Sequence, residues 1–272
     1  MVMTSCGLIL GLVASSSPTV PSPRSNRDII GRRCSTRAIV PELHMVINGT
    51  SLSKTVDAVN AMQFDGRALA AAERGHVARW IAARQGLPGA YGGTFAGFPA
   101  ERTSGIVLFT GERIAFASAR HILGEEASRV LRLLRVRDRR ITRALEAADV
   151  GLLRCVARAA EDPRRRNPGL FCCGKCSVGF WRNLLAGGLD RHEERLQRGA
   201  RHLRAVRDGQ YGWRRFPFWY TVLALSEMDG NEAVAELKYA APALERAASR
   251  AVPSAVYARR RHELAFRALN RL

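Results

Sequence analysis

The sequence contains very little lysine, few aromatic residues and no long apolar run. Only Lys54, Lys175 and Lys238 among its 43 basic residues are lysines, and aromatic residues make up 7% of the 272 positions. No stretch reaches the roughly 18 to 20 uninterrupted apolar residues that cross a bilayer, so no membrane span is expected. Hydrophobic residues at 47% and charged residues at 25% are ordinary for a folded protein and exclude wholesale disorder.

The chain carries a large excess of positive charge, almost all of it from arginine. Its 43 basic and 24 acidic residues give a formal net charge of +19. Arginines are densest in residues 129–143, 164–166 and 259–261. Such a surface suits a non-catalytic helical scaffold that binds an acidic protein or nucleic acid. No helix-turn-helix, RNP or zinc-finger spacing accompanies these runs, so specific nucleic-acid binding is not expected.

Residues 1–44 differ in composition from the rest of the chain. A short apolar run at residues 7–14 is followed by a segment rich in serine, proline and arginine. The basic residues follow the apolar run and no good cleavage site is present, which is unlike a secretory signal, although a cryptic signal or transit peptide is an alternative. We expect a disordered tail, or a start assigned too early with Met45 as the initiator, ahead of one folded domain at residues 45–272.

Six cysteines are present, and three of them lie within five residues. This crowding is unlike the spread of cysteines in a disulfide framework. It favours a reducing compartment, so we expect a cytoplasmic protein.

Apolar residues recur at three- and four-residue intervals from Val56 onward, which is helical spacing. Glycine, proline and aspartate separate the periodic segments, and only residues 105–109 have a strand-like pattern. The sequence therefore predicts an all-α chain of helical hairpins. Helices are expected at residues 67–85, 114–123, 125–134, 142–159, 177–185, 192–206, 219–228, 231–250 and 257–269.

Two segments share a basic-glycine pair, a bulky pair, a polar helix end, a glycine turn and a large aromatic residue. The copies are Arg74-Gly75, Trp80-Ile81, Gln85, Gly89 and Tyr91, and Arg198-Gly199, His202-Leu203, Arg207, Gly212 and Trp213. This pattern resembles the QW repeat of the terpenoid cyclase and protein prenyltransferase superfamily. The resemblance implies an α/α toroid of helical hairpins, with the completeness of the ring left open. It also implies a protein that binds an isoprenoid or other apolar small molecule and, if it is an enzyme, a metal-assisted transferase acting on prenyl-type substrates.

The acidic motifs of that superfamily are missing from this chain. It has no Asp-x-Asp-Asp acid and no Asp-Asp pair. Of the zinc triad of the protein prenyltransferases only Cys176 has a counterpart, because the aspartate position falls on Gly174 and the histidine position on Tyr220. The resemblance therefore does not carry the zinc triad over to this chain.

Cys172, Cys173 and Cys176 are the candidate metal ligands. The Cys-x-x-Cys separation of Cys173 and Cys176 lets two thiolates bind one zinc ion, and Cys172 is a third candidate. A redox pair and the packing of small buried side chains at a turn are the alternatives. A fourth ligand would be water or one of three distant residues, His192, His202 or Cys155.

His121 and Glu125 are candidates for acid–base chemistry, and Tyr220 is a further catalytic candidate. On a continuous helix His121 and Glu125 would share a face, being four residues apart. Gly124 is expected to interrupt that helix, however, so Glu125 and Glu126 fit better as the acidic first turn of the next helix, with a capping and salt-bridge role.

Residues 213–220 are the most aromatic stretch and the candidate ligand-binding segment. Arginines beside aromatic rings suit a diphosphate with an apolar tail. The same residues are equally consistent with the inner wall of a toroid that binds nothing. A wide cavity lined by these rings favours the ligand-binding protein, and a filled centre favours the scaffold. The candidate residues are Arg207, Trp213, Arg214, Phe216, Trp219 and Tyr220.

Overall fold

The computed structural model describes residues 46–161 and 169–272, which belong to one compact unit that starts at residue 44. The regular structure of this range is almost entirely helical, so the all-α prediction is confirmed. No helix in the described ranges is long and apolar enough to cross a membrane. The expected tail at residues 1–44 and the arginines at residues 164–166 lie outside the described residues. The helices are α1 (Leu52–Phe64), α2 (Ala71–Ala82), α3 (Pro99–Ser104), α4 (Phe116–Leu134), α5 (Arg139–Glu161), α6 (Gly174–Leu185), α7 (His192–Ala205), α8 (Phe218–Glu227), α9 (Asn231–Ala248) and α10 (Val256–Leu269).

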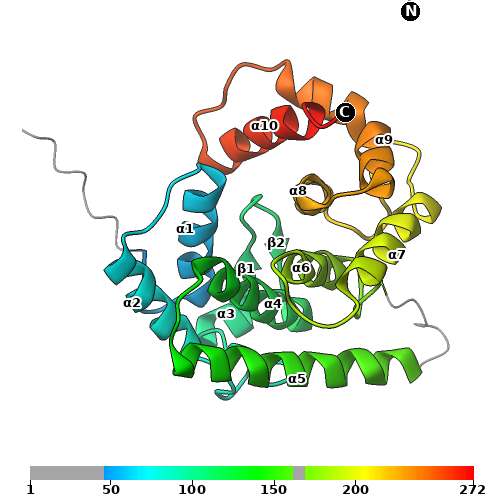
Figure 1. The fold of residues 1–272 in the computed structure, drawn as a ribbon. Coiled ribbons are helices and arrows are strands. Elements are labelled where there is room, and N and C mark those ends of the chain that lie inside the picture. Colours follow the sequence, from blue (N-terminus) through cyan, green and yellow to red (C-terminus); the bar gives the residue numbers. More distant parts are fainter. Residues whose placement is uncertain (1–45, 162–168) are drawn as a thin grey trace, which may run out of the picture. The chain divides into compact units, whose positions relative to one another are not determined.

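Three helices, α4, α6 and α8, lie inside a surround formed by α1, α2, α5, α7, α9 and α10 (Figure 1). The inner helices pack in a row, α4 against α6 and α6 against α8. Of the surrounding helices, α2 and α5 pack on α4, α7 packs on α6, and α9 and α10 pack on α8. The largest fully buried side chains include Trp181, Tyr220 and Phe180 of the inner helices, because these helices are covered on several sides.

Helix α4 is continuous, so the prediction of two helices separated at Gly124 was wrong. A glycine within a helix costs about 1 kcal/mol relative to alanine, which made a break the natural expectation. The reason for this glycine is close packing. A Cβ atom at Gly124 would lie 2.2 Å from Oγ1 of Thr94, so a larger residue would push the preceding loop away from α4. The expected acidic first turn at Glu125 and Glu126 therefore lies in the middle of a helix.

A short hairpin occupies the space between α1 and α8 (Figure 1). Its strands, β1 (Ile106–Val107) and β2 (Arg113–Ile114), are antiparallel, in agreement with the strand-like pattern of residues 105–109. The tip is tied to distant helices: Glu112 Oε1 accepts the backbone N–H of Tyr220 at 3.0 Å, and Arg261 Nε donates to the Thr110 carbonyl at 2.6 Å. The cavity left beside Tyr220 measures about 20 Å³, about the room of one water molecule. The protein thus leaves almost no empty space at its centre beside Tyr220.

The two copies of the sequence repeat form equivalent junctions at the ends of α2 and α7. A β-bridge pairs Gln85 with Phe95 in the first and Arg207 with Trp213 in the second. Each bridge is flanked by the same two backbone hydrogen bonds, of 2.8 and 3.0 Å. When the two junctions are aligned, Phe95 is equivalent to Trp213. This corrects the sequence alignment, in which Tyr91 was equivalent to Trp213. Both aromatic side chains are buried, as expected for a ring that covers a helix end.

Candidate metal centre

The spacing of donor atoms around α4 and α6 depends on the short segment that leads into α6. Phe171 is buried in this segment, and Ser177 of α6 fixes its backbone. The Ser177 hydroxyl accepts the Phe171 N–H at 2.9 Å and lies 2.8 Å from the Cys173 carbonyl, to which it donates. The turn is therefore held against the first turn of α6, and the cysteines follow directly from it.

Cys172 has a left-handed backbone conformation, with φ of 57°. Successive side chains in extended backbone point to opposite sides, so two neighbouring cysteines would normally diverge. A left-handed residue breaks this alternation and lets Cys172 and Cys173 approach one region. Left-handed backbone is unfavourable for a residue other than glycine, and such strain is concentrated at functional sites.

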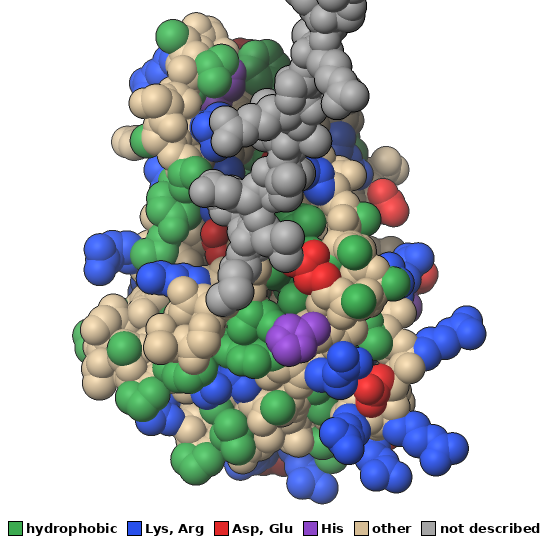
Figure 2. Space-filling view, turned by 90° about the vertical axis from the view of Figure 1, so that its left-hand side faces the viewer, with side chains coloured by type: hydrophobic (Ala, Val, Ile, Leu, Met, Phe, Trp, Pro, Cys, Tyr) green, Lys and Arg blue, Asp and Glu red, His purple; other side chains and the backbone are tan. Residues whose placement is uncertain are grey.

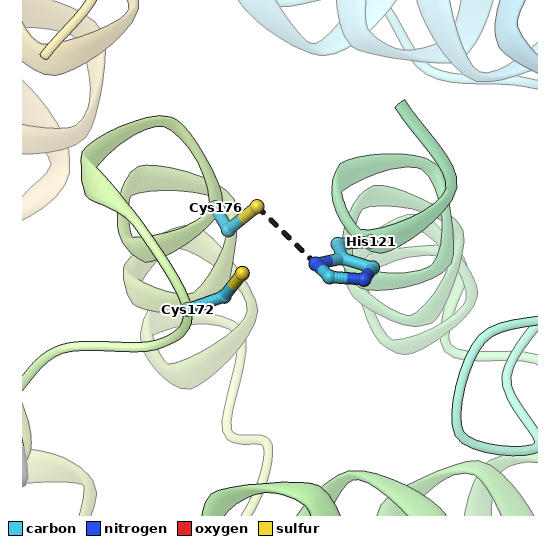
Figure 3. A group of neighbouring side chains, drawn as sticks. All are labelled: His121, Cys172 and Cys176. Carbon is cyan, nitrogen blue, oxygen red and sulfur yellow. Dashed lines mark hydrogen bonds between the residues drawn. The ribbon is translucent and has the colours of Figure 1, made fainter. Parts of the chain in front are cut away.

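Four potential ligands meet between α4 and α6. The Nδ1 atom of His121 lies 3.4 Å from the Sγ atom of Cys176, and the Sγ atoms of Cys173 and Cys176 are 3.5 Å apart. One donor atom from each of His121, Cys172 and Cys176 lies within 4.8 Å of the others (Figure 3). Zinc–sulfur bonds of about 2.3 Å and zinc–nitrogen bonds of about 2.0 Å place tetrahedral donors about 3.5 to 3.8 Å apart. This cluster can hold a metal ion with little movement.

The protonation states of Cys173 and His121 suit metal binding. Hydrogen bonds from the Cys172 and Cys176 thiols lower the pKa of Cys173, so this residue carries the thiolate. Hydrogen bonds with Cys172 and Cys173, together with burial, raise the pKa of Cys176, so this thiol must lose its proton when it binds a metal. Burial lowers the pKa of His121 to about 4, so its imidazole is neutral at pH 7. Thiolate and neutral imidazole are the forms that ligate a metal.

The His121 ring is held by aromatic neighbours. The Tyr91 ring lies 3.7 Å from it between centroids, and the Phe171 ring lies at 5.8 Å. Burial raises the pKa of Tyr91, as does the hydrogen bond between its hydroxyl and Cys155. Tyr91 thus links the cluster to α5, a role that the repeat pattern did not indicate.

The structure supplies His121 as the partner of the cysteines, in place of the three distant residues considered from the sequence. Cys155 contacts Arg158, whose Nη2 atom lies 3.4 Å from its sulfur. His202 lies beside Phe216, with 6.2 Å between the rings, and His192 lines a surface cavity between α6 and α7. His121 was identified in the sequence, but as an acid–base candidate with Glu125.

Glu125 does not join His121 in a common site. Its carboxyl is completely buried and accepts a hydrogen bond of 2.8 Å from the Asn183 side chain, while its Oε1 atom is buried without a partner. Burial raises the pKa of Glu125 to about 8, so the carboxyl is mostly protonated at pH 7. Glu125 and His121 therefore lie on one face of α4 but do not form a common reactive site.

Glu125→Gln should remove a pH dependence of stability. Because the pKa of Glu125 is raised from 4.5 to about 8 on folding, the native state holds a proton that the unfolded state releases. Wild-type stability should therefore fall between about pH 4.5 and pH 8, by on the order of 1 kcal/mol per pH unit. Urea unfolding at pH 5 and pH 8.5 measures the difference between wild type and variant, which should favour the variant only at pH 8.5. The exposed Glu146→Gln is the control, and a variant that tracks wild type at both pH values contradicts the assignment.

Tyr220 belongs to a buried network of charges that the sequence did not reveal. Its hydroxyl donates to Glu126 at 2.5 Å, and Arg182 also contacts that carboxylate. Arg182 reaches Glu227 through two nitrogens at 2.9 Å, and Arg129 binds the same carboxylate at 2.9 Å. Arginine and glutamate are usually exposed, so nothing in the sequence marked these positions as interior.

The candidate ligand-binding residues do not converge on one site. Arg207 and Trp213 both bind Glu236 of α9: the Arg207 guanidinium at 2.8 Å and the indole N–H at 2.9 Å. Phe216 stacks on Trp181 with 5.7 Å between the rings. These contacts join the segment between α7 and α8 to α6 and α9 and make the three residues part of the packing.

Trp219 and Arg214 also have contacts or exposure that do not indicate a common ligand site. Trp219 packs edge-on against Phe218 at 5.0 Å, and Arg214 is exposed. None of the four cavities that we describe within residues 46–161 and 169–272 is lined by Trp213, Phe216 or Trp219.

The arginines between α4 and α5 divide into two groups. Arg129 and Arg132 are bound to carboxylates, Arg132 to Asp149 at 2.5 Å. The others are exposed. Figure 2 shows Lys and Arg side chains outnumbering Asp and Glu on one face, with several towards its lower edge. The exposed arginines are Arg135, Arg137, Arg139, Arg140 and Arg143.

The cluster at His121 is therefore the best-formed candidate site in the described residues, and it must be interpreted from its own geometry. Comparison with known proteins finds no matching family model, no matching curated protein and no matching solved structure.

Proposed function

We propose that this chain is a zinc-binding helical protein whose metal is held by His121, Cys172, Cys173 and Cys176. The observation that carries the proposal is that His121, Cys172 and Cys176 each bring a donor atom within 4.8 Å of the others, with the Cys173 sulfur 3.5 Å from that of Cys176. A ligand set of three cysteines and one histidine is typical of zinc sites with no open position, whose role is structural. Soft thiolate ligands also argue against magnesium or calcium, which prefer oxygen.

The role of the metal follows from where its ligands lie. His121 comes from the first turns of α4, and Cys176 from the first turn of α6, while Cys172 and Cys173 lie just before α6. One ion thus joins two inner helices to the segment that follows α5. We infer that zinc fixes the junction of α4 and α6 and holds the strained turn at Cys172 in place.

Metal analysis of the purified chain tests the proposal. Inductively coupled plasma mass spectrometry should find about one zinc per chain in wild type, and much less in Cys176→Ser and His121→Gln. Cys155→Ser is the matched control, since Cys155 is also buried but contacts Tyr91 and Arg158. Full zinc in the control and loss in the two ligand variants supports the site. Absence of metal in wild type after reconstitution under reducing conditions contradicts it.

Cobalt substitution tests the fourth ligand. A tetrahedral cobalt site with three thiolates gives stronger sulfur-to-metal charge-transfer absorption than one with two, so Cys173→Ser should weaken this band. An unchanged band in Cys173→Ser assigns the fourth position to water and makes the site an open one.

We also propose that the outer and inner helices derive from a repeated α-hairpin related to the α/α toroids. The equivalent junctions at Gln85–Phe95 and Arg207–Trp213 support this relation. Isoprenoid binding is a weaker proposal, because the hairpin tip occupies the centre and leaves a cavity of only about 20 Å³ beside Tyr220. The small volume of this cavity favours a non-catalytic scaffold over an isoprenoid-binding protein. The exposed arginines are then the surface that would bind an acidic partner.

A further inference from the structure

A second cavity, of about 240 Å³, lies where the C-terminal parts of several helices meet. Its wall is formed by α1, α4, α6, α8 and α10, and the ring of Phe109 at the hairpin tip contributes one side. It lies on the far side of the buried charge network from the metal cluster, since Arg182 is six residues along α6 from Cys176. Nothing in the proposed metal site uses this cavity.

The wall of this cavity is unusually basic. It contains four guanidinium groups and a single carboxylate, that of Glu227. Arg129 and Arg182 share this carboxylate, and their side chains are only 10% and 3% exposed. Glu227 is thus the one negative charge in the wall, and it pairs with two buried positive charges. Glu126 is not part of the wall and pairs with Arg182 from the other side.

The two outer arginines have mostly uncharged partners. Arg267 donates to the Phe64 carbonyl at 2.6 Å and Arg271 to the Met228 carbonyl at 2.6 Å, which caps the ends of α1 and α8. Their carboxylate partners, Glu263 and Asp229, are half and fully exposed, where water and salt screen them. The positive charge of both guanidiniums is therefore only weakly compensated at the cavity.

An amide completes the polar wall. The Oε1 atom of Gln63 is buried without a hydrogen-bond partner beside the arginines. Amide oxygen and nitrogen exchange places by a simple flip, so the Gln63 side chain can offer either a donor or an acceptor at this position. Burying a charged network is costly, and replacing it with apolar side chains is often neutral or stabilising. A network of this kind beside a cavity is better explained by a ligand than by stability.

We propose that this cavity binds a small phosphate-type dianion, such as inorganic phosphate or pyrophosphate, through Arg129, Arg182, Arg267 and Arg271. Guanidinium groups match phosphate oxygens with paired hydrogen bonds. The four arginines exceed the two buried carboxylates Glu126 and Glu227 by two charges, which favours a doubly charged ligand. A cavity of about 240 Å³ is smaller than the roughly 300 to 1,000 Å³ of sites for drug-sized ligands, so the anion itself fills it.

Isothermal titration of the full chain with pyrophosphate and with phosphate, at constant ionic strength, tests the proposal. Binding should saturate at about one anion per chain and weaken by about tenfold in Arg267→Gln, the loss of one charge-assisted contact. Arg259→Gln is the matched control, since it removes an exposed arginine of the same helix outside the cavity. Its affinity should stay within about twofold of wild type.

Four results overturn the proposal. The first is no saturable binding, and the second is an equal loss of affinity in Arg267→Gln and Arg259→Gln, which assigns the anion to the general surface charge. The third is loss of binding in Cys176→Ser, which assigns the anion to the metal instead of the cavity. Citrate serves as a carboxylate probe, and tighter binding of citrate than of pyrophosphate contradicts the phosphate assignment. Retained binding in Cys176→Ser keeps the cavity proposal independent of the zinc proposal.

Discussion

Chelation of the metal should lower the stability of wild type by about 4 kcal/mol when free zinc had been held near 1,000 times its dissociation constant. The physical reason is linkage: zinc binds the native arrangement of His121 and the three cysteines, and the unfolded chain lacks that arrangement. For a domain of this size the loss corresponds to a fall in Tm of about 10 °C. Scanning calorimetry with zinc, and again with excess chelator, measures it under reducing conditions.

The control for chelation is Cys155→Ser. This variant loses some packing of its own, but the further drop caused by the chelator should equal that of wild type. Cys176→Ser should show almost no further drop, because its metal site is already incomplete. Equal responses of Cys155→Ser and Cys176→Ser to the chelator would contradict the assignment of ligands.

Arg182→Met should cost about 3 to 5 kcal/mol of unfolding free energy. Arg182 is 3% exposed and holds both Glu126 and Glu227, so its loss leaves two carboxylates without their main partner. Burial disfavours the charged form of each carboxylate, so the cost falls on the native state. Urea unfolding at pH 7 measures the loss, which corresponds to a fall in Tm of about 10 °C.

A surface pair provides the matched control for Arg182→Met. Arg198 pairs with Glu194 at 3.0 Å, and its side chain is 51% exposed. Arg198→Met should cost less than about 1 kcal/mol. Glu227→Gln combined with Arg182→Met should lose less than the sum of the two single variants, because the two residues share one contact. A small loss in Arg182→Met, equal to that of Arg198→Met, would show that the network contributes little.

The periodic parts of the chain were predictable because they depend on local pattern. Apolar spacing located α5 to α10 to within a few residues, and the crowding of Cys172, Cys173 and Cys176 identified most of the metal cluster. His121 was recognised as reactive but assigned to the wrong neighbour. It is about fifty residues from the cysteines, and only the packing of α4 on α6 brings them together.

The rest depended on tertiary contacts that no spacing reveals. Glycine is typical of a helix break, yet Gly124 lies within a helix at a point where Thr94 approaches closely. Arginine is typical of a protein surface, yet Arg129 and Arg182 are buried with carboxylates from other helices. The left-handed conformation of Cys172, which lets adjacent cysteines converge, has no sequence signal because the residue is not glycine.

The ties between the hairpin and α10 set the order in which the chain can fold. Arg260 binds Asp57 of α1 at 2.8 Å and the Phe109 carbonyl at 3.0 Å, across about 200 and 150 residues. Contacts between such distant residues require closing a long loop, and proteins rich in them fold slowly. On the ribosome, α1 and the hairpin emerge long before α10 is made. The surfaces of α1 and the hairpin that α10 covers therefore stay exposed until α10 has been made, and they are the part of the growing chain that would need a chaperone.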